Sequence, residues 1–450
     1  FFNDTATTEI YTRGTLFPYT TLSDLNDGVS TLALRKVGTG ALTIQGNSFY
    51  TGGVTVEAGR LVLGSNTALG RGTTVTVLSG GSLDINNTYH GNADNGARRF
   101  NVVLAGAGDG TAANPALANT NGTGPNASVG IYNLTLAANA TFGGNGGRFD
   151  IGRVEGSEAY GAISSAAGQT YTLTKVGTNQ VNLRGRVSDL ALVVNGGTVG
   201  FEDSDVGASV SATVNTGASL GTWGLRSVAA GFTLNNGATL TNLGGATATW
   251  SGAGTLGSAA GDAVNVNSTN GSIVLAGALS GPARLNLNGT ANFVQLGGNN
   301  AGLTGDIVVA STGSLGINQN NALGTGALTL TGAATLDNFS GAPVVVAGGT
   351  TVNFNNNFAF GGTGALDFGA RNFTGAAART ITVGGTQALR IGGAINLGAN
   401  TLTIASGTAN SGAYGANVEN PGRGGRFVLA GANTFGMEAT VRITMGPPMQ

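Results

Sequence analysis

The sequence repeats a short phrase in which one or two glycines precede an apolar strand of alternating residues. Measured on their glycines, neighbouring copies lie about 20 residues apart, as from Gly59 to Gly81 and from Gly332 to Gly349. The copies are AGRLVL from Ala58, SGGSLDI from Ser79, NGGTVGF from Asn195, NTGASLGT from Asn215, NNGATLTN from Asn235, STGSLGIN from Ser311, LTGAATLDN from Leu330 and AGGTTVNF from Ala347. Such a period, containing only turns and short strands, is typical of a stacked coil.

Short strands fill most of the chain between these turns, and no stretch of about 11 residues carries the 3.6-residue period of a helix. Examples are ALTIQ from Ala41, GVTVEA from Gly53, YTLTKV from Tyr171 and NTLTIA from Asn400. Two or three such strands in each period predict an all-β fold, a parallel β-helix (solenoid) in which strands pair from one turn to the next. At about 20 residues per turn, the chain would make roughly 20 turns.

The composition excludes several classes of protein. Gly accounts for 81 of 450 residues, but Pro for only 8, and no Gly-X-Y period exists, so the chain is not collagen-like. Charged residues make up 9% and are balanced, 20 basic against 21 acidic, which argues against nucleic acid as a partner. The absence of cysteine excludes disulfides and thiolate metal sites. No apolar run long enough for a membrane helix and no secretion signal is visible.

The two ends interrupt the pattern. FFNDTATTEIYT and TLFPYTTL, within residues 1–22, resemble translated sequencing adapter, so we expect these residues to be a non-native leader that packs little against the coil. Residues 23–450 are expected to form a single β-helix solenoid. The closing VRITMGPPMQ stops partway through a repeat-like phrase, which suggests an internal fragment.

Three stretches are poor in alternating apolar residues and are expected to leave the coil as loops. The longest covers about residues 86–130 and is expected to contain one strand near residues 100–104, and shorter ones cover residues 148–168 and 411–426. Because loops on a regular scaffold can vary without disturbing its core, the stretch from 86 to 130 is the expected working surface.

Residues 34–86 resemble the autotransporter-associated β-strand repeat of bacterial passenger domains. The ordered motif is L-x-K-x-G-x-G-x-L-x-L-x-G, then T-G-G-x-T-V, A-G-x-L-x-L and N-x-A-L-G-x-G-x-V-T-V. Weaker copies follow, and alignment on Gly46, Gly185, Gly298 and Gly431 spaces them by about six turns of the coil each. Together the copies cover about half of the chain.

The resemblance implies a right-handed β-helix passenger that is exported to the surface of a Gram-negative bacterium. In this family an outer-membrane β-barrel downstream anchors the passenger; this chain shows neither that barrel nor a signal peptide. The repeat itself carries no catalytic residues. The resemblance therefore implies an extracellular stalk or adhesin, with a host-surface or glycan ligand bound through its loops.

His90 is the only histidine, so it is the only candidate for a histidine base. A Ser-His-Asp triad could combine it with Asp94 or Asp109 and with Ser82 or Ser128. No G-x-S-x-G motif occurs, and the surrounding sequence predicts a solvated loop. We therefore predict that His90 is not catalytic.

The acidic residues give two further candidate sites. Glu202, Asp203 and Asp205 form the densest acidic run and could bind Ca²⁺, but the run aligns with Asn-rich turns in other copies and lacks a calcium-loop motif. The second candidate is a set of carboxylates like those of polysaccharide-cleaving enzymes. Its members are spaced about 30 residues apart, out of phase with a coil of about 20 residues per turn. They are Asp306, Asp337 and Asp367.

Aromatic residues in the second half of the chain could form a ligand platform, but their strand phase favours a stacked core ladder. They are Phe354, Phe358, Phe360, Phe368 and Phe373. We therefore predict no catalytic, cofactor-binding or metal-binding residues and no cofactor. A glycan-acting β-helix enzyme, recognised by an exposed carboxylate pair about 5 to 9 Å apart, and a phage-type fibre remain alternatives.

Strand alternation also predicts which side chains of the first copy face the core. Glu57, Arg60 and Asp84 are expected to point outward. The inward set is Leu61, Leu63, Val75, Val77, Leu83 and Ile85.

Overall fold

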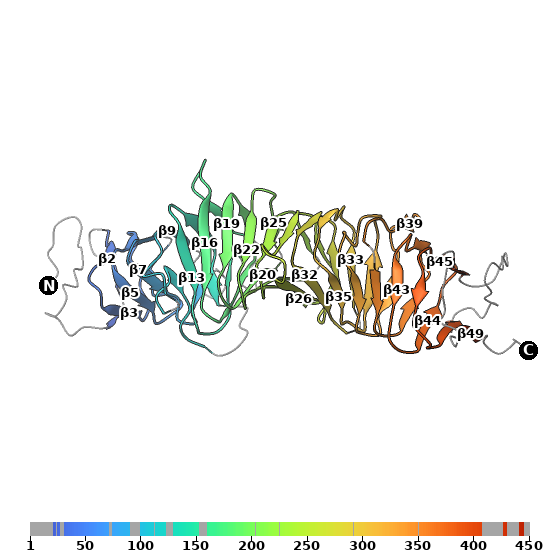
Figure 1. Ribbon diagram of the computed structural model, residues 1–450. Helices are drawn as coiled ribbons and strands as arrows, with labels where there is room; N and C mark the ends of the chain where they lie inside the picture. The colour runs from blue at the N-terminus through green and yellow to red at the C-terminus, as the bar shows by residue number, and fades with distance from the viewer. Residues whose placement is uncertain are drawn as a thin grey trace, which may run out of the picture. The chain divides into compact units, whose positions relative to one another are not determined.

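The structure is a computed structural model of the chain (Figure 1). It describes residues 21–23, 25–27, 31–71, 74–90, 100–111, 113–122, 129–152, 160–202, 204–224, 226–290, 292–349, 351–406, 426–429 and 441–444. These residues contain strands and turns and no helix, and none of them forms a helix that could cross a membrane. The chain divides into two compact units, residues 1–231 and 232–450.

Unit 1 is built from three parallel sheets, which we call A1, B1 and C1. Sheet A1 contains β1 (Thr21–Ser23), β3 (Ala41–Gln45), β5 (Gly59–Leu63), β7 (Gly81–Asp84), β10 (Leu117–Ala118), β13 (Ala140–Gly143), β16 (Tyr171–Val176), β19 (Leu190–Val194) and β22 (Ser211–Val214). Sheet B1 contains β2 (Leu34–Lys36), β4 (Val54–Val56), β6 (Thr74–Leu78), β9 (Asn101–Ala105), β12 (Asn133–Leu136), β15 (Ala162–Ser165), β18 (Arg186–Ser188), β21 (Asp205–Val206) and β24 (Arg226–Val228). Sheet C1 contains β8 (Tyr89–His90), β11 (Gly130–Ile131), β14 (Phe149–Ile151), β17 (Gln180–Leu183), β20 (Thr198–Glu202) and β23 (Ser219–Trp223).

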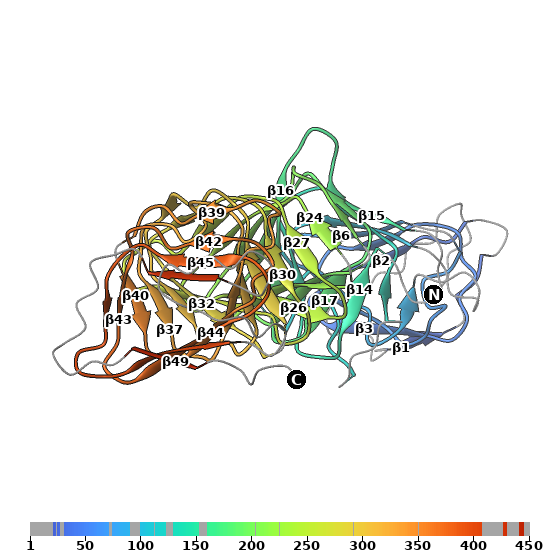
Figure 2. The same ribbon diagram turned by 90° about the vertical axis from the view of Figure 1, so that its right-hand side faces the viewer.

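Unit 2 has four parallel sheets, A2 to D2; three of its D2 strands, β39, β42 and β45, lie side by side in Figure 2. Sheet A2 contains β25 (Gly231–Leu234), β28 (Gly254–Leu256), β31 (Leu279–Gly281) and β34 (Gly302–Leu303). Sheet B2 contains β27 (Ala248–Trp250), β30 (Ile273–Leu275), β33 (Phe293–Leu296), β36 (Ser314–Ile317), β38 (Thr335–Asp337), β41 (Phe358–Phe360), β44 (Arg379–Val383), β47 (Leu402–Ser406) and β49 (Val441–Thr444). Sheet C2 contains β26 (Thr239–Gly244), β29 (Ala263–Asn267), β32 (Arg284–Asn288), β35 (Ile307–Val309), β37 (Leu328–Leu330), β40 (Thr351–Phe354), β43 (Asn372–Thr374) and β46 (Ile395–Asn396). Sheet D2 contains β39 (Val344–Val345), β42 (Leu366–Asp367), β45 (Ala388–Ile391) and β48 (Arg426–Leu429).

Each unit is therefore a parallel β-solenoid, which confirms the predicted fold. The solenoid has about 16 turns in all, fewer than expected. The difference comes from uneven turn lengths. Val187 pairs with Val206 across a short turn, whereas Val102 pairs with Leu134 across a much longer one.

The core follows the predicted alternation. All six residues of the inward set are fully buried, at 0% exposure. Glu57 and Arg60 are partly exposed, as expected for outward positions, and Asp84 also points outward but is buried. Its carboxylate accepts hydrogen bonds from the backbone N–H and hydroxyl of Thr120, so the segment after β10 supplies the partners of this outward-facing side chain.

Much of the predicted loop at residues 86–130 belongs to the coil. It contains β8, β9 and β10, and Phe100, Leu104 and Leu117 are completely buried. Residues 148–168 likewise contain β14 and β15. β9 confirms the strand expected near residues 100–104. The low apolar content did not indicate the other strands, because strands of two to four residues are enough to continue the sheets.

The ends are described only in part. Thr21 and Leu22, within the predicted leader, belong to β1, which pairs with β3. Residues 1–20 lie outside the described residues, and so does all but the last residue of the predicted loop 411–426.

Candidate functional site

The outer face of sheet C1 carries a cluster of charged side chains. In β14, β17 and β20 the alternate residues face the core, and Phe149, Val181 and Phe201 are fully buried there. The intervening positions point away from the core. Parallel register places Asp150 of β14 beside Asn182 of β17. The cluster is completed by Arg148, Arg184 and Glu202, which lie at or beside the ends of the same strands.

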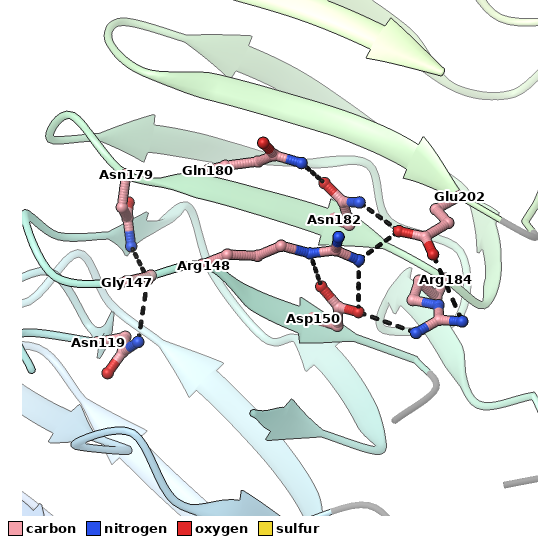
Figure 3. Close-up of polar contacts among 9 residues, drawn as sticks. All are labelled: Asn119, Gly147, Arg148, Asp150, Asn179, Gln180, Asn182, Arg184 and Glu202. Atoms are coloured by element: carbon pink, nitrogen blue, oxygen red, sulfur yellow. Dashed lines mark hydrogen bonds and ion pairs between the residues drawn. The ribbon is translucent and has the colours of Figure 1, made fainter. Parts of the chain in front are cut away.

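These five side chains form one connected network (Figure 3). Arg148 donates through Nε and Nη2 to the two oxygens of Asp150, at 2.8 and 2.9 Å, and also donates to Glu202. Arg184 Nη1 donates to Asp150 at 3.0 Å, and its Nη2 lies 3.5 Å from Glu202. Asn182 donates to Glu202. The network thus ties three consecutive turns together by charge-assisted bonds.

Burial dominates the electrostatics of the cluster. Asp150 is 0% exposed, and its burial raises the pKa of the carboxyl to about 6, against the opposing effect of the Arg148 guanidinium. Burial lowers the pKa of Arg148, but the hydrogen bond and charge of Asp150 and the charge of Glu202 hold it above its usual value. Two guanidinium groups therefore face two carboxyl groups in a site that water hardly reaches.

This arrangement bears on the enzyme alternative. Asp150 and Glu202 both accept from Nη2 of Arg148, so their carboxyl groups lie close together. However, each also faces Arg184, and both are buried. A glycosidase needs one carboxyl group to reach the scissile bond and a second to reach water or the sugar. The Asp150–Glu202 pair is instead enclosed, and Arg148 and Arg184 balance its negative charge.

Two buried lysines form a second recurring feature. Lys36 Nζ donates to the carbonyls of Val37, Gly38 and Ala58, at 3.0, 2.7 and 2.9 Å. Ala58 lies in the next turn, so the ammonium joins two turns at one corner. Lys36 is 2% exposed, and burial lowers its pKa.

Lys175 repeats this geometry in the second copy of the L-x-K-x-G phrase. Its Nζ donates to the carbonyls of Val176, Gly177 and Gly196, at 2.8, 2.9 and 3.3 Å. Lys175 is 0% exposed, and burial lowers its pKa to about 7. We call these two arrangements the lysine clamps.

Unit 2 contains a related arginine. Arg371 is 1% exposed, and its guanidinium donates to the carbonyls of Gly324 and Gly326, at 2.9 and 3.2 Å. It precedes β43 and reaches past β40 to the turn before β37, and so spans two turns. Burial lowers its pKa to about 10. Gly349 lies beneath it, where any Cβ would overlap the guanidinium.

The predicted triad residues have other roles in the structure. The backbone of His90 lies in β8 and pairs with Ile131, so the predicted solvated loop was wrong at this position. Ser82 is buried and donates to the carbonyl of Pro115 at 2.7 Å. Asp109 accepts from Thr111 and Asn114 within its own turn. Asp94 and Ser128 lie outside the described residues.

The predicted acidic sites also separate. Glu202 ends β20 and belongs to the buried cluster, not to an Asn-like turn. Asp203 lies outside the described residues, and Asp205 is exposed in β21. Asp306, Asp337 and Asp367 lie before β35, in β38 and in β42, on three different sheets. Among the described residues, no group of three or more histidine, cysteine or acidic side chains could hold a metal ion.

The predicted aromatic ladder is a core feature. Its five phenylalanines are all at most 3% exposed. Phe373 contacts Phe354, Phe358 and Phe368, with ring centroids 6.1, 6.3 and 5.1 Å apart. These rings fill the interior of unit 2 and leave no platform for a ligand.

Comparison with known families supports the sequence resemblance. The model of the passenger-associated-transport-repeat matches at residues 34–63 and 322–353. The first match contains Lys36 and its clamp; the second contains the turn whose carbonyls bind Arg371. No curated protein and no solved structure matches the chain. Passenger-associated transport repeats carried on a parallel β-solenoid make this chain consistent with an autotransporter passenger domain.

Proposed function

We propose that the chain is a non-enzymatic, surface-displayed passenger segment that acts as a stalk or adhesin. The observation that supports this most directly is that the two neighbouring carboxyl groups, those of Asp150 and Glu202, are inaccessible. Asp150 and Glu202 are buried and bonded to Arg148 and Arg184, so neither is available to a substrate. The repeat matches support display at the surface of a Gram-negative bacterium.

Display on cells tests the proposal. The full chain is fused to an unrelated outer-membrane anchor in a laboratory Gram-negative strain, and adhesion to epithelial cells and to immobilised glycans is compared with cells that carry the anchor alone. The adhesin role predicts increased adhesion, whereas a stalk alone predicts no increase. Equal adhesion of the two strains would contradict an adhesin role and leave the stalk role.

A hydrolysis assay separates the glycan-acting alternative. Purified chain is incubated with neutral and acidic polysaccharides, and released reducing ends are counted. We expect none above the level of a heat-denatured sample. Release that disappears in both Asp150→Asn and Glu202→Gln, with the fold intact by circular dichroism, would overturn the non-enzymatic proposal and favour a glycan-acting enzyme.

A further inference from the structure

One register position at the corner between sheets C1 and B1 carries an unusual series of residues. The strand pairs Ile131 with Ile151, Ile151 with Leu183, and Leu183 with Phe201. Glu202, the next residue, pairs with Trp223. The equivalent position in five successive turns is therefore occupied by Tyr132, Gly152, Arg184, Glu202 and Trp223. We call this series the corner ladder.

The corner ladder has aromatic residues at both ends and an ion pair between them. Parallel strands lie about 4.8 Å apart, so Tyr132 and Trp223 are separated by roughly 19 Å along the coil. Trp223 is 43% exposed, and Tyr132 is partly exposed. Tyr132 donates its hydroxyl to the carbonyl of Tyr160, a second tyrosine at this corner, which is 48% exposed. Large hydrophobic side chains are otherwise rarely exposed in the described residues, where only Phe49 and Val345 are comparable.

The Trp223 ring lies beside the buried cluster. The guanidinium of Arg148 lies 6.0 Å from the centroid of its ring system. Arg148 is itself fixed by two hydrogen bonds to Asp150 and one to Glu202. A fixed cation beside the ring favours one placement of the ring, which reduces the conformational entropy that is lost when a ligand covers its outer face. Preorganisation of this kind distinguishes Trp223 from an incidental surface aromatic.

The surrounding charge and polarity select the class of ligand. The two arginines of the cluster are matched by two carboxyl groups, so the cluster carries no excess positive charge to attract a polyanion. Polar side chains continue along the same outer face of C1, where Gln180, Thr198 and Ser219 are in register and partly exposed. Aromatic rings combined with amide and hydroxyl groups suit a sugar. Its C–H faces stack on a ring, and its hydroxyls bond to polar groups.

We propose that the corner ladder, with Trp223 as its anchor, is a binding site for a neutral polysaccharide lying along successive turns of unit 1. This inference deepens the proposed adhesin function and rests on it. The ligand would stack on Trp223 and extend over the Arg184–Glu202 pair toward Tyr160 and Tyr132. The site lies on the regular coil, outside the loop at residues 86–130 that the sequence suggested as the working surface.

The two tryptophans of the chain make a direct test possible. Trp250 is fully buried in unit 2, so a ligand-induced change in tryptophan emission or in iodide quenching reports Trp223. The full chain is titrated with neutral hexasaccharides from cellulose, starch, xylan and mannan, and with heparin as a polyanion. We expect a blue shift and reduced quenching with at least one neutral probe, and little change in affinity with added salt.

Variants locate the site. Trp223→Ala should weaken binding of that probe by about tenfold or more, as expected for an anchor residue. Trp223→Tyr, which keeps a ring, should retain most of the affinity by calorimetry but lose the emission change. The matched control is Phe49→Ala, because Phe49 is 42% exposed and lies 4.9 Å from the Arg71 guanidinium. It should bind like the unmodified chain.

Three results would overturn the inference: no binding of any neutral probe, binding of heparin alone, or equal binding by Trp223→Ala. The adhesion assay on displayed cells separates this failure from failure of the proposed function. If cells carrying Trp223→Ala still adhere as well as the unmodified strain, the adhesin role stands and this site is wrong. If their adhesion is lost only on protein-coated surfaces, the partner is a protein and the glycan assignment fails.

Discussion

Lys36 and Lys175 lie in separate copies of the repeat, far apart in the chain, yet their ammonium groups donate to equivalent backbone positions. Each bonds to the carbonyls of the two residues that follow it and to one carbonyl in the next turn. Among the described ion pairs neither lysine has a carboxylate partner. In the described part of the chain, the buried ammonium group is thus stabilised by oriented carbonyl dipoles and by no carboxylate. It therefore loses its proton at a lower pH than an exposed lysine does.

The Lys175 clamp should make stability depend on pH. Its folded pKa of about 7 lies below the ordinary value of 10.5, so between these values the unfolded chain binds the proton and the folded chain does not. Stability therefore rises as pH increases from about 7 to 10.5, and this gain is already lost once pH has fallen to about 7. Denaturant unfolding from about pH 6 to 10 measures it. Lys175→Met should lack this part of the slope, whereas an identical slope in both chains would contradict the clamp.

Arg148→Met tests the buried cluster. Removing this arginine leaves two buried carboxyl groups with one guanidinium, and loss of a buried ionic partner typically costs about 3 to 5 kcal/mol. Burial raises the pKa of Asp150 to about 6 even though Arg148 opposes the rise, so removal of Arg148 should raise this pKa further. The variant should therefore recover part of its loss as pH falls from 7 to 5, where the carboxyl takes up a proton. The free energy of unfolding at pH 7 and pH 5 gives both quantities.

The control for this prediction is Arg390→Met. Arg390 pairs with Asp367 at 2.6 Å, but its side chain is 44% exposed. Exposed pairs contribute at most about 1 kcal/mol. Equal losses for the two variants would mean that the buried cluster is no more important than a surface pair.

Gly349→Ala tests the contact with Arg371. A Cβ at this position would overlap the guanidinium, and the backbone φ of +63° is unfavourable for alanine. We expect faster amide exchange around β37, β40 and β43 and a stability loss of about 1 to 3 kcal/mol. Gly40→Ala is the control, since a Cβ there meets nothing within 4 Å. Unchanged exchange in Gly349→Ala would argue against the tight packing of Arg371.

Leu63→Asp tests the register of the first copy. Leu63 is fully buried, and burying one aliphatic side chain contributes about 1.5 to 3 kcal/mol, to which an unpaired buried carboxylate adds a further cost. Val62, the preceding residue, is partly exposed on the opposite face of β5. Val62→Asp should therefore leave the thermal unfolding curve of unit 1 nearly unchanged. Similar curves for the two variants would show that the two faces of β5 are misassigned.

Local alternation was sufficient to predict the core of the first copy, because side chains two residues apart must share a face of a strand. It did not indicate that Asp84 would be buried. That residue points away from the core, but the segment containing Thr120 covers it, and no local pattern specifies how such a distant segment folds back.

The buried cluster could not be predicted from the chain alone. Arg148 and Glu202 are distant in the sequence, and they meet because two turns of unequal length bring them to the same outer face of C1, two strands apart, where the long arginine side chain spans the gap. The turn from Asp150 to Asn182 is much longer than the turn from Asn182 to Gly200. A fixed number of residues per turn therefore no longer identifies equivalent positions after two turns. What the sequence does indicate is that Asp150 and Asn182 occupy outward-facing positions in their own strands.

The two lysine clamps occupy different corners of unit 1. Lys36 lies between a B1 strand and an A1 strand, and Lys175 lies between an A1 strand and a C1 strand. The L-x-K-x-G phrase is therefore associated with a bend between two sheets, and not with one particular sheet. Two copies of it need not be separated by a whole number of turns, and the sheet that follows the bend differs between the two copies.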